Sequence, residues 1–195
     1  MILKEIQNNL QRLYQLEVDQ NVEDFLTGEG DTGKETLWIR NNGKELQIAL
    51  FIDPAILQKL KRQNPFRQIN GKNLNAFLIA VEGVSHFVYF LKKAVAKKPV
   101  TRLEMELQAE VDKYLLCVFL FFQQEGKVPS FLFAALFENI RLASDLYQEA
   151  NRLASKFCAR LDRDYLRTHR WPKVLEKARH FYNLDHWAKI AQLMP

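Results

Sequence analysis

The sequence contains little cysteine, glycine or proline: two cysteines, seven glycines and six prolines among 195 residues. Such low glycine and proline contents exclude a collagen-like or low-complexity chain. Cys117 and Cys158 are each flanked by apolar residues, which favours two reduced, buried thiols over a disulfide. A Cys-x-x-Cys spacing is absent, and we therefore expect no bound metal.

Signatures of nucleotide-dependent and hydrolytic enzymes are also missing. The sequence has no Walker lysine loop, dinucleotide fingerprint, nucleophile elbow, zinc-protease helix or kinase signature. Gly28, Gly30 and Gly33 lie in an acidic stretch that lacks the flanking strand and helix of a phosphate-binding loop, so we expect a connector there. These absences argue against nucleotide-driven chemistry, and we expect no cofactor.

The sequence has no uncharged run of membrane-spanning length. The runs 114–122 and 128–137 cover nine and ten residues, whereas a spanning helix needs about 20. The first residues of the chain show no pattern of a secretory signal. We therefore expect a cytoplasmic protein in which these runs are facing core helices, and an interfacial or re-entrant membrane anchor is the less favoured alternative.

What the sequence does contain is the composition of a folded domain. Hydrophobic residues make up 48% and charged residues 26% of the chain, which is enough to bury a substantial core. We expect a single domain over residues 1–195, with an N-terminal αββα unit over residues 1–65 and a helical bundle over residues 72–195. The predicted fold class is mainly α (α+β), with the N-terminal helix and β-hairpin packed on the C-terminal helical bundle.

The N-terminal unit is predicted from periodicity and turn residues. Apolar residues recur every three or four positions over residues 2–17, which indicates an amphipathic helix. Two β-rich runs, 36–40 and 45–52, flank an Asn-Asn-Gly-Lys turn that is typical of a hairpin. Asp53-Pro54 predicts the start of a short helix.

The remainder is predicted to be helical, because its apolar residues follow helical spacing and its breaks fall at capping residues and prolines. Thr101-x-x-Glu104, for example, is a capping box. The predicted helices cover residues 73–97, 101–125, 129–168 and 172–192, the last of them broken at Asn183.

Positive charge is concentrated at the C-terminal end. Residues 1–151 carry 18 basic and 19 acidic side chains, whereas residues 152–195 carry 10 and 4, a net charge of +6. Five basic residues share one predicted helix face and two more follow it: Arg152, Lys156, Arg160, Arg163 and Arg167, then Arg170 and Lys173. This pattern predicts an anionic partner, either a nucleic acid or an acidic protein surface, with a merely solvated helix face as the alternative.

Residues 163–169 also carry an Arg followed after five residues by a His. This spacing resembles the motif of helical ribonucleases of the HEPN class, but the resemblance covers only these seven residues and does not assign the chain to that class. On a regular helix Arg163 and His169 would lie about 120° apart, so they could act together only if the helix deforms or a second chain contributes. Tyr165, His169 and Trp171 are suited to stacking on bases.

A polar stripe interrupts the apolar helix predicted over residues 73–97. It consists of Glu82, Ser85, His86 and Tyr89, and the following helix offers Glu106, Glu110 and Lys113 as partners. Buried carboxylate and imidazole groups need partners, so the favoured interpretation is a structural network. Glu82, His86, Tyr89, Glu106 and Glu110 are also candidates for a catalytic or small-ligand site, and a metal site is the third alternative.

The sequence thus favours a non-enzymatic, intracellular helical binding or regulatory protein that uses its basic C-terminal face. The alternative is an enzyme or small-ligand-binding protein centred on Glu82, His86 and Tyr89. We also expect a homodimer, because Trp38 and Phe51 are predicted to point away from the core face of the hairpin.

Overall fold

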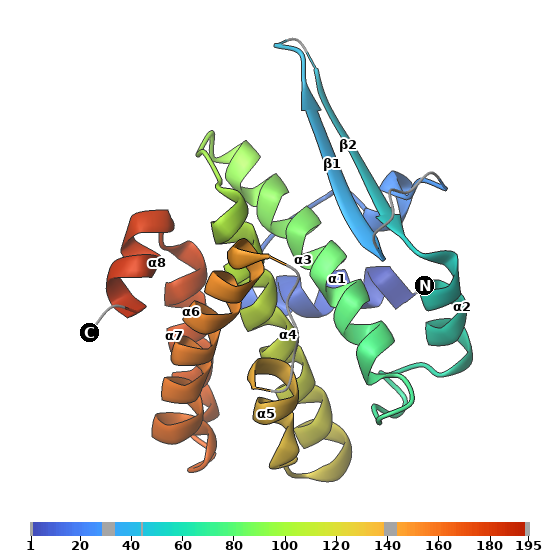
Figure 1. Cartoon of the computed structure of the whole chain (residues 1–195). Helices are drawn as coiled ribbons and strands as arrows, with labels where there is room; N and C mark the ends of the chain where they lie inside the picture. Colours follow the sequence, from blue (N-terminus) through green and yellow to red (C-terminus); the bar gives the residue numbers. More distant parts are fainter. Residues whose placement is uncertain (1, 29–33, 44, 139–143, 194–195) are drawn as a thin grey trace.

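The computed structural model describes residues 2–28, 34–43, 45–138 and 144–193. The protein is 67% helical, with eight α-helices and one antiparallel hairpin in its described part (Figure 1). The predicted fold class is therefore confirmed. The elements in order are α1 (Ile2–Tyr14), η1 (Val22–Phe25), β1 (Glu35–Asn41), β2 (Leu46–Ile52), α2 (Pro54–Arg62), α3 (Leu74–Val95), α4 (Arg102–Glu125), α5 (Phe131–Phe137), α6 (Asp145–Leu161), η2 (Asp162–Leu166), α7 (Trp171–Asn183) and α8 (His186–Leu193).

Helix α3 lies at the centre of the molecule, in contact with α1, α2, α4 and both strands. It is long and apolar enough to cross a membrane, with a mean hydropathy of 1.5 in its most apolar window, but 67% of that window is buried inside the fold. This burial is typical of the core helix of a soluble protein. Helix α4 packs against α3 on one side and α6 on the other.

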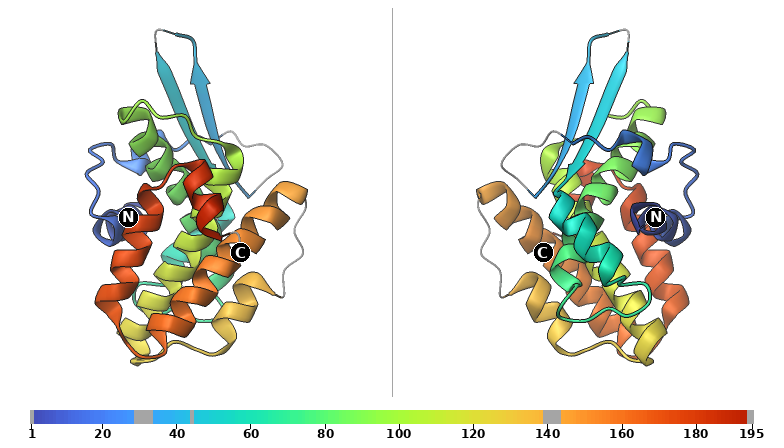
Figure 2. Two further views of the ribbon diagram at one scale, coloured as in Figure 1. Left: turned by 90° about the vertical axis from the view of Figure 1, so that its left-hand side faces the viewer. Right: turned by 90° about the vertical axis from the view of Figure 1, so that its right-hand side faces the viewer.

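The hairpin packs on α3 only at its base. Its strands pair in register through Leu37↔Leu50 and Ile39↔Ile48, and Figure 2 shows the distal half standing clear of the helices in both views. Trp38 is 37% exposed. Phe51 is buried, but it lies off the core face that Leu50 and Ile52 form, with its ring 6.3 Å from that of Trp38, as predicted. The dimer that we inferred from both residues stays a prediction.

Most predicted boundaries lie close to the observed ones, because local capping groups fix them. The Asp53 carboxylate accepts a hydrogen bond from the amide of Ala55 and begins α2. The Thr101 hydroxyl accepts from the amide of Glu104 and begins α4. The connector predicted around Gly30 and Gly33 lies outside the described residues.

The single helix predicted over residues 129–168 is wrong. Helix α5 ends at Phe137, and Ser144, with extended φ and ψ of −147° and 161°, caps a new helix, α6. At its other end α6 passes into η2, a π-helical turn in which the amide of Arg167 bonds the carbonyl of Asp162. Because Pro172 lies at the start of α7 and lacks an amide hydrogen, the chain turns before it and α7 runs back beside α6, with Phe157 stacked on Phe181.

Candidate functional site

The polar stripe of α3 divides into three separate groups. In the first, the Lys113 ammonium of α4 donates to Glu82 at 3.0 Å and to Glu110 at 2.5 Å. Burial lowers the pKa of Lys113, but the two carboxylates outweigh it and the pKa is raised. Burial also raises the pKa of Glu110. One ammonium group therefore pairs with both carboxylates.

In the second group, His86 lies between two carboxylates. Its Nε2 atom is 3.3 Å from Oε2 of Glu106, and its Nδ1 atom is 3.8 Å from Oε2 of Glu35 at the start of β1. Only 5% of His86 is exposed. Burial lowers the pKa of the imidazole, but Glu106 and Glu35 outweigh it, so the pKa lies well above 6.5. His86 is therefore enclosed at ion-pair distance between two carboxylates, while its Nε2 atom and Oε2 of Glu35 make no hydrogen bond within the described residues.

In the third group, Tyr89 has partners different from those of His86. Its hydroxyl donates to Glu104 at 2.5 Å and accepts from the Lys189 ammonium of α8 at 2.9 Å. Lys93 also donates to Glu104, at 2.6 Å. Burial, together with Glu104, raises the pKa of Tyr89. Tyr89 is thus part of the attachment of α8 to the core.

The Tyr89 group continues into the centre of the fold. Lys189 donates to Gln108 at 2.6 Å, and Asp112 accepts from Ser85 at 2.6 Å and from Tyr14 of α1 at 2.5 Å. Burial lowers the pKa of Lys189 to about 7 and raises the pKa of Asp112 to about 6. This network joins α1, α3, α4 and α8.

The three groups consist of ion pairs and hydrogen bonds between buried side chains of different elements. The candidates Glu82, His86, Tyr89, Glu106 and Glu110 have ionic or hydrogen-bonded partners, and the surface hollows described below are lined by other residues. Sequence reasoning missed Glu35, Glu104, Asp112 and Lys189. Asp112 is a charged residue beside the apolar stripe of its helix, and this position indicated a buried polar group. Its partners could not be predicted, because they come from elements distant in the sequence.

The basic residues of the C-terminal segment lie along α6, η2 and the start of α7. Several are paired with nearby acids on the surface: Arg152 with Glu149, Arg163 with Asp164, Arg167 with Asp162 and Lys173 with Glu176. Exposed ion pairs of this kind contribute little stability, so a phosphate can compete with the acidic residue for the basic side chain. Arg160 donates to the carbonyl of Gln192, and Arg170 lies 5.0 Å over the ring of Tyr165.

Two hollows share Arg163 as a lining residue. A shallow one of about 360 Å³ is lined by Lys156, Arg160 and Arg163 together with Leu193 of α8. The other is a cleft of about 830 Å³ between the α4–α5 segment and the α6–η2–α7 corner. The helix face predicted to carry the basic residues is therefore bordered by hollows, and Arg163 lines both of them.

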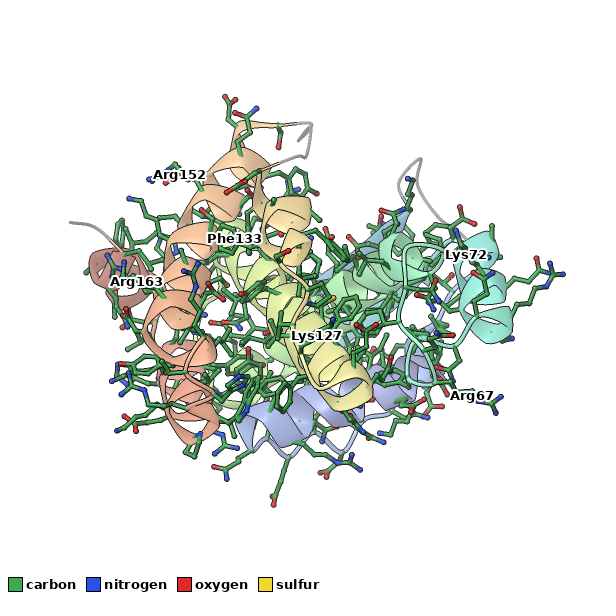
Figure 3. All side chains as sticks on the ribbon, turned by 90° about the horizontal axis from the view of Figure 1, so that it is seen from below. Arg67, Lys72, Lys127, Phe133, Arg152 and Arg163 are labelled. Carbon is green, nitrogen blue, oxygen red and sulfur yellow. The ribbon has the colours of Figure 1, made fainter. Side chains whose placement is uncertain are left out.

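The walls of the cleft combine charge with aromatic rings. Its basic groups are Lys127, Arg163 and Arg167, its acidic groups are Glu138 and Asp162, and its rings are Tyr114, Phe133, His169 and Trp171. Figure 3 shows Lys127 and Phe133 on the α5 side of this face and Arg163 on the α6 side. The deformation at η2, followed by a φ of 52° at His169, brings Arg163 and His169 to one cleft.

A further hollow of about 550 Å³ adjoins the cleft. It is lined by Lys127, Val128, Pro129 and Ser130, which also line the cleft, and by Asn70 and Phe131. Phe131 is 54% exposed.

Comparison with protein-family models, with curated proteins and with solved structures finds no match to this chain. In the described part of the chain, no group of three or more His, Cys, Asp or Glu residues is arranged to hold a metal ion.

Proposed function

We propose that the protein is a non-enzymatic binding protein that holds a nucleic acid on its basic C-terminal face. The observation that carries this proposal is the coincidence of a net charge of +6 over residues 152–195 with hollows bordered by those basic residues. Arginine guanidinium groups bind phosphate oxygens in a bidentate manner, and release of condensed counterions favours the contact.

The rings in the cleft favour a nucleic acid over an acidic protein. An acidic protein surface offers carboxylates to the same arginines but no aromatic bases, whereas Phe133, His169 and Trp171 line the cleft beside Arg163 and suit a ligand that combines phosphates with bases. The candidate site at His86 is less favoured, because its imidazole is enclosed between carboxylates.

The test compares two variants that each lose three positive charges. We expect Arg160/Arg163/Arg167→Ala to lose most of its affinity for a labelled oligonucleotide, single-stranded or duplex, because its phosphate contacts are removed. The control, Lys59/Lys61/Arg62→Ala, removes exposed charges from α2 and should bind like the wild-type protein. Fluorescence anisotropy at fixed salt measures both.

Equal losses in the two variants would indicate attraction to net charge alone and would contradict the proposal. Absence of oligonucleotide binding by the wild-type protein, with capture of an acidic protein instead, would also contradict it.

A further inference from the structure

We infer, on the basis of the proposed function, that the nucleic acid is single-stranded and that an unpaired base enters the cleft between α5 and the α6–α7 corner. The three hollows are neighbours, because successive hollows share lining residues. Arg163 borders the shallow hollow and the cleft, and Lys127 borders the cleft and the hollow at Phe131. A flexible strand can follow a path along the three hollows, with its phosphates alternately at the two basic residues.

The cleft has the size and the lining for a base. Its volume of about 830 Å³ lies within the roughly 300–1,000 Å³ of small-ligand pockets. Phe133 and Trp171 are half-buried and held by other rings: Phe133 lies 6.0 Å from Tyr114, and Trp171 lies 4.4 Å from Phe122, measured between ring centroids. Rings held in this way offer fixed stacking surfaces.

A duplex does not suit this cleft. Its bases are stacked and paired inside the helix, whereas unpaired bases can be turned outward onto aromatic side chains. The acidic residues Glu138 and Asp162 also line the cleft and repel a phosphate that enters deeply. The arrangement therefore favours a base inside the cleft, with its phosphates at the rim on Arg163, Arg167 and Lys127.

Phe131 extends the path beyond Lys127. It is the first residue of α5, 54% exposed, and it lines the third hollow. An exposed ring beside a basic side chain is a sequence-tolerant stacking platform for a following base. Because the ring is exposed, it can be removed with little effect on the core.

The experiment uses the full chain, a labelled oligothymidylate of about 15 nucleotides and a duplex of the same length. We expect the single strand to bind at least roughly tenfold more tightly than the duplex. Phe131→Ala should weaken single-strand binding by roughly 5- to 150-fold, the range of base–aromatic stacking, with an unchanged salt dependence. Phe131→Tyr should restore the affinity.

The control is Trp187→Ala, which removes a 77% exposed ring of α8 outside the three hollows and should leave binding unchanged. Equal affinity for duplex and single strand, or full affinity in Phe131→Ala, would overturn this inference. The proposed function would still stand if the arginine variant lost binding. If neither oligonucleotide binds, both proposals are wrong.

Discussion

His86 illustrates how one buried residue depends on elements that are far apart in the sequence. The sequence placed it on the same helix face as Glu82, one turn away. In the structure its ring instead faces Glu106 of α4 and Glu35 of β1. The need for a partner was predictable from burial. The identity of the partner was not, because Glu35 reaches His86 only through the packing of the hairpin on α3.

Replacement of His86 tests whether this group stabilises the fold. We expect His86→Ala to lower the free energy of unfolding by roughly 2–4 kcal/mol near neutral pH, because it leaves two buried carboxylates without their cation. The exposed His180 provides the control, and His180→Ala should change the stability by less than about 0.5 kcal/mol. Urea titration measures both.

The same variant also has a defined pH dependence. The folded pKa of His86 is raised above 6.5, so its stabilising contribution is fully present below pH 6.5 and is lost as the pH rises through the folded pKa. The stability difference between wild type and His86→Ala should therefore shrink on the alkaline side. An unchanged urea midpoint in His86→Ala would contradict the structural role and would point to a ligand site at His86.

At the scale of elements, the sequence predicted the hairpin and α2 well but not the course of the chain after α4. Asn-Gly and Asp-Pro are strong local signals, and they fixed the hairpin turn and the start of α2. Between residues 129 and 168, a continuous apolar pattern outweighed the weaker capping signal of Ser144. The π-helical turn η2 and the corner at His169 bring Arg163 and His169 to the cleft, and periodicity alone does not predict them.

The contact of the hairpin with α3 depends on Gly83. A Cβ atom at this position would lie 3.2 Å from both Leu50 Cδ1 and Glu35 Oε2. Gly83→Val should therefore displace the base of the hairpin and cost roughly 1–3 kcal/mol by overpacking. Gly71→Val is the control, since no atom lies within 4 Å of its added Cβ, and we expect little change. Thermal unfolding compares the two, and equal midpoints would show that the close approach is unimportant.

At the scale of the whole molecule, composition predicted the class of the fold and the asymmetry of charge, but only the folded chain shows what the charged residues face. Of the ten basic residues in the C-terminal segment, Lys189 is fully buried in the core network, and several others form surface ion pairs. Lys127 lines the same cleft as Arg163. A division of the sequence at residue 151 had assigned Lys127 to the N-terminal segment, which carries no excess of positive charge.

The central claim is that this face contacts phosphates, and the salt dependence of oligonucleotide binding tests it most directly. If about four phosphates are contacted, the logarithm of the association constant should fall against the logarithm of salt concentration with a slope near −3.6 for a duplex and about −2.8 for a single strand. For Arg160/Arg163/Arg167→Ala, the slope should be shallower than that of the wild-type protein by about 2 to 3. A wild-type slope near zero would contradict the account, because binding would then involve no displaced counterions.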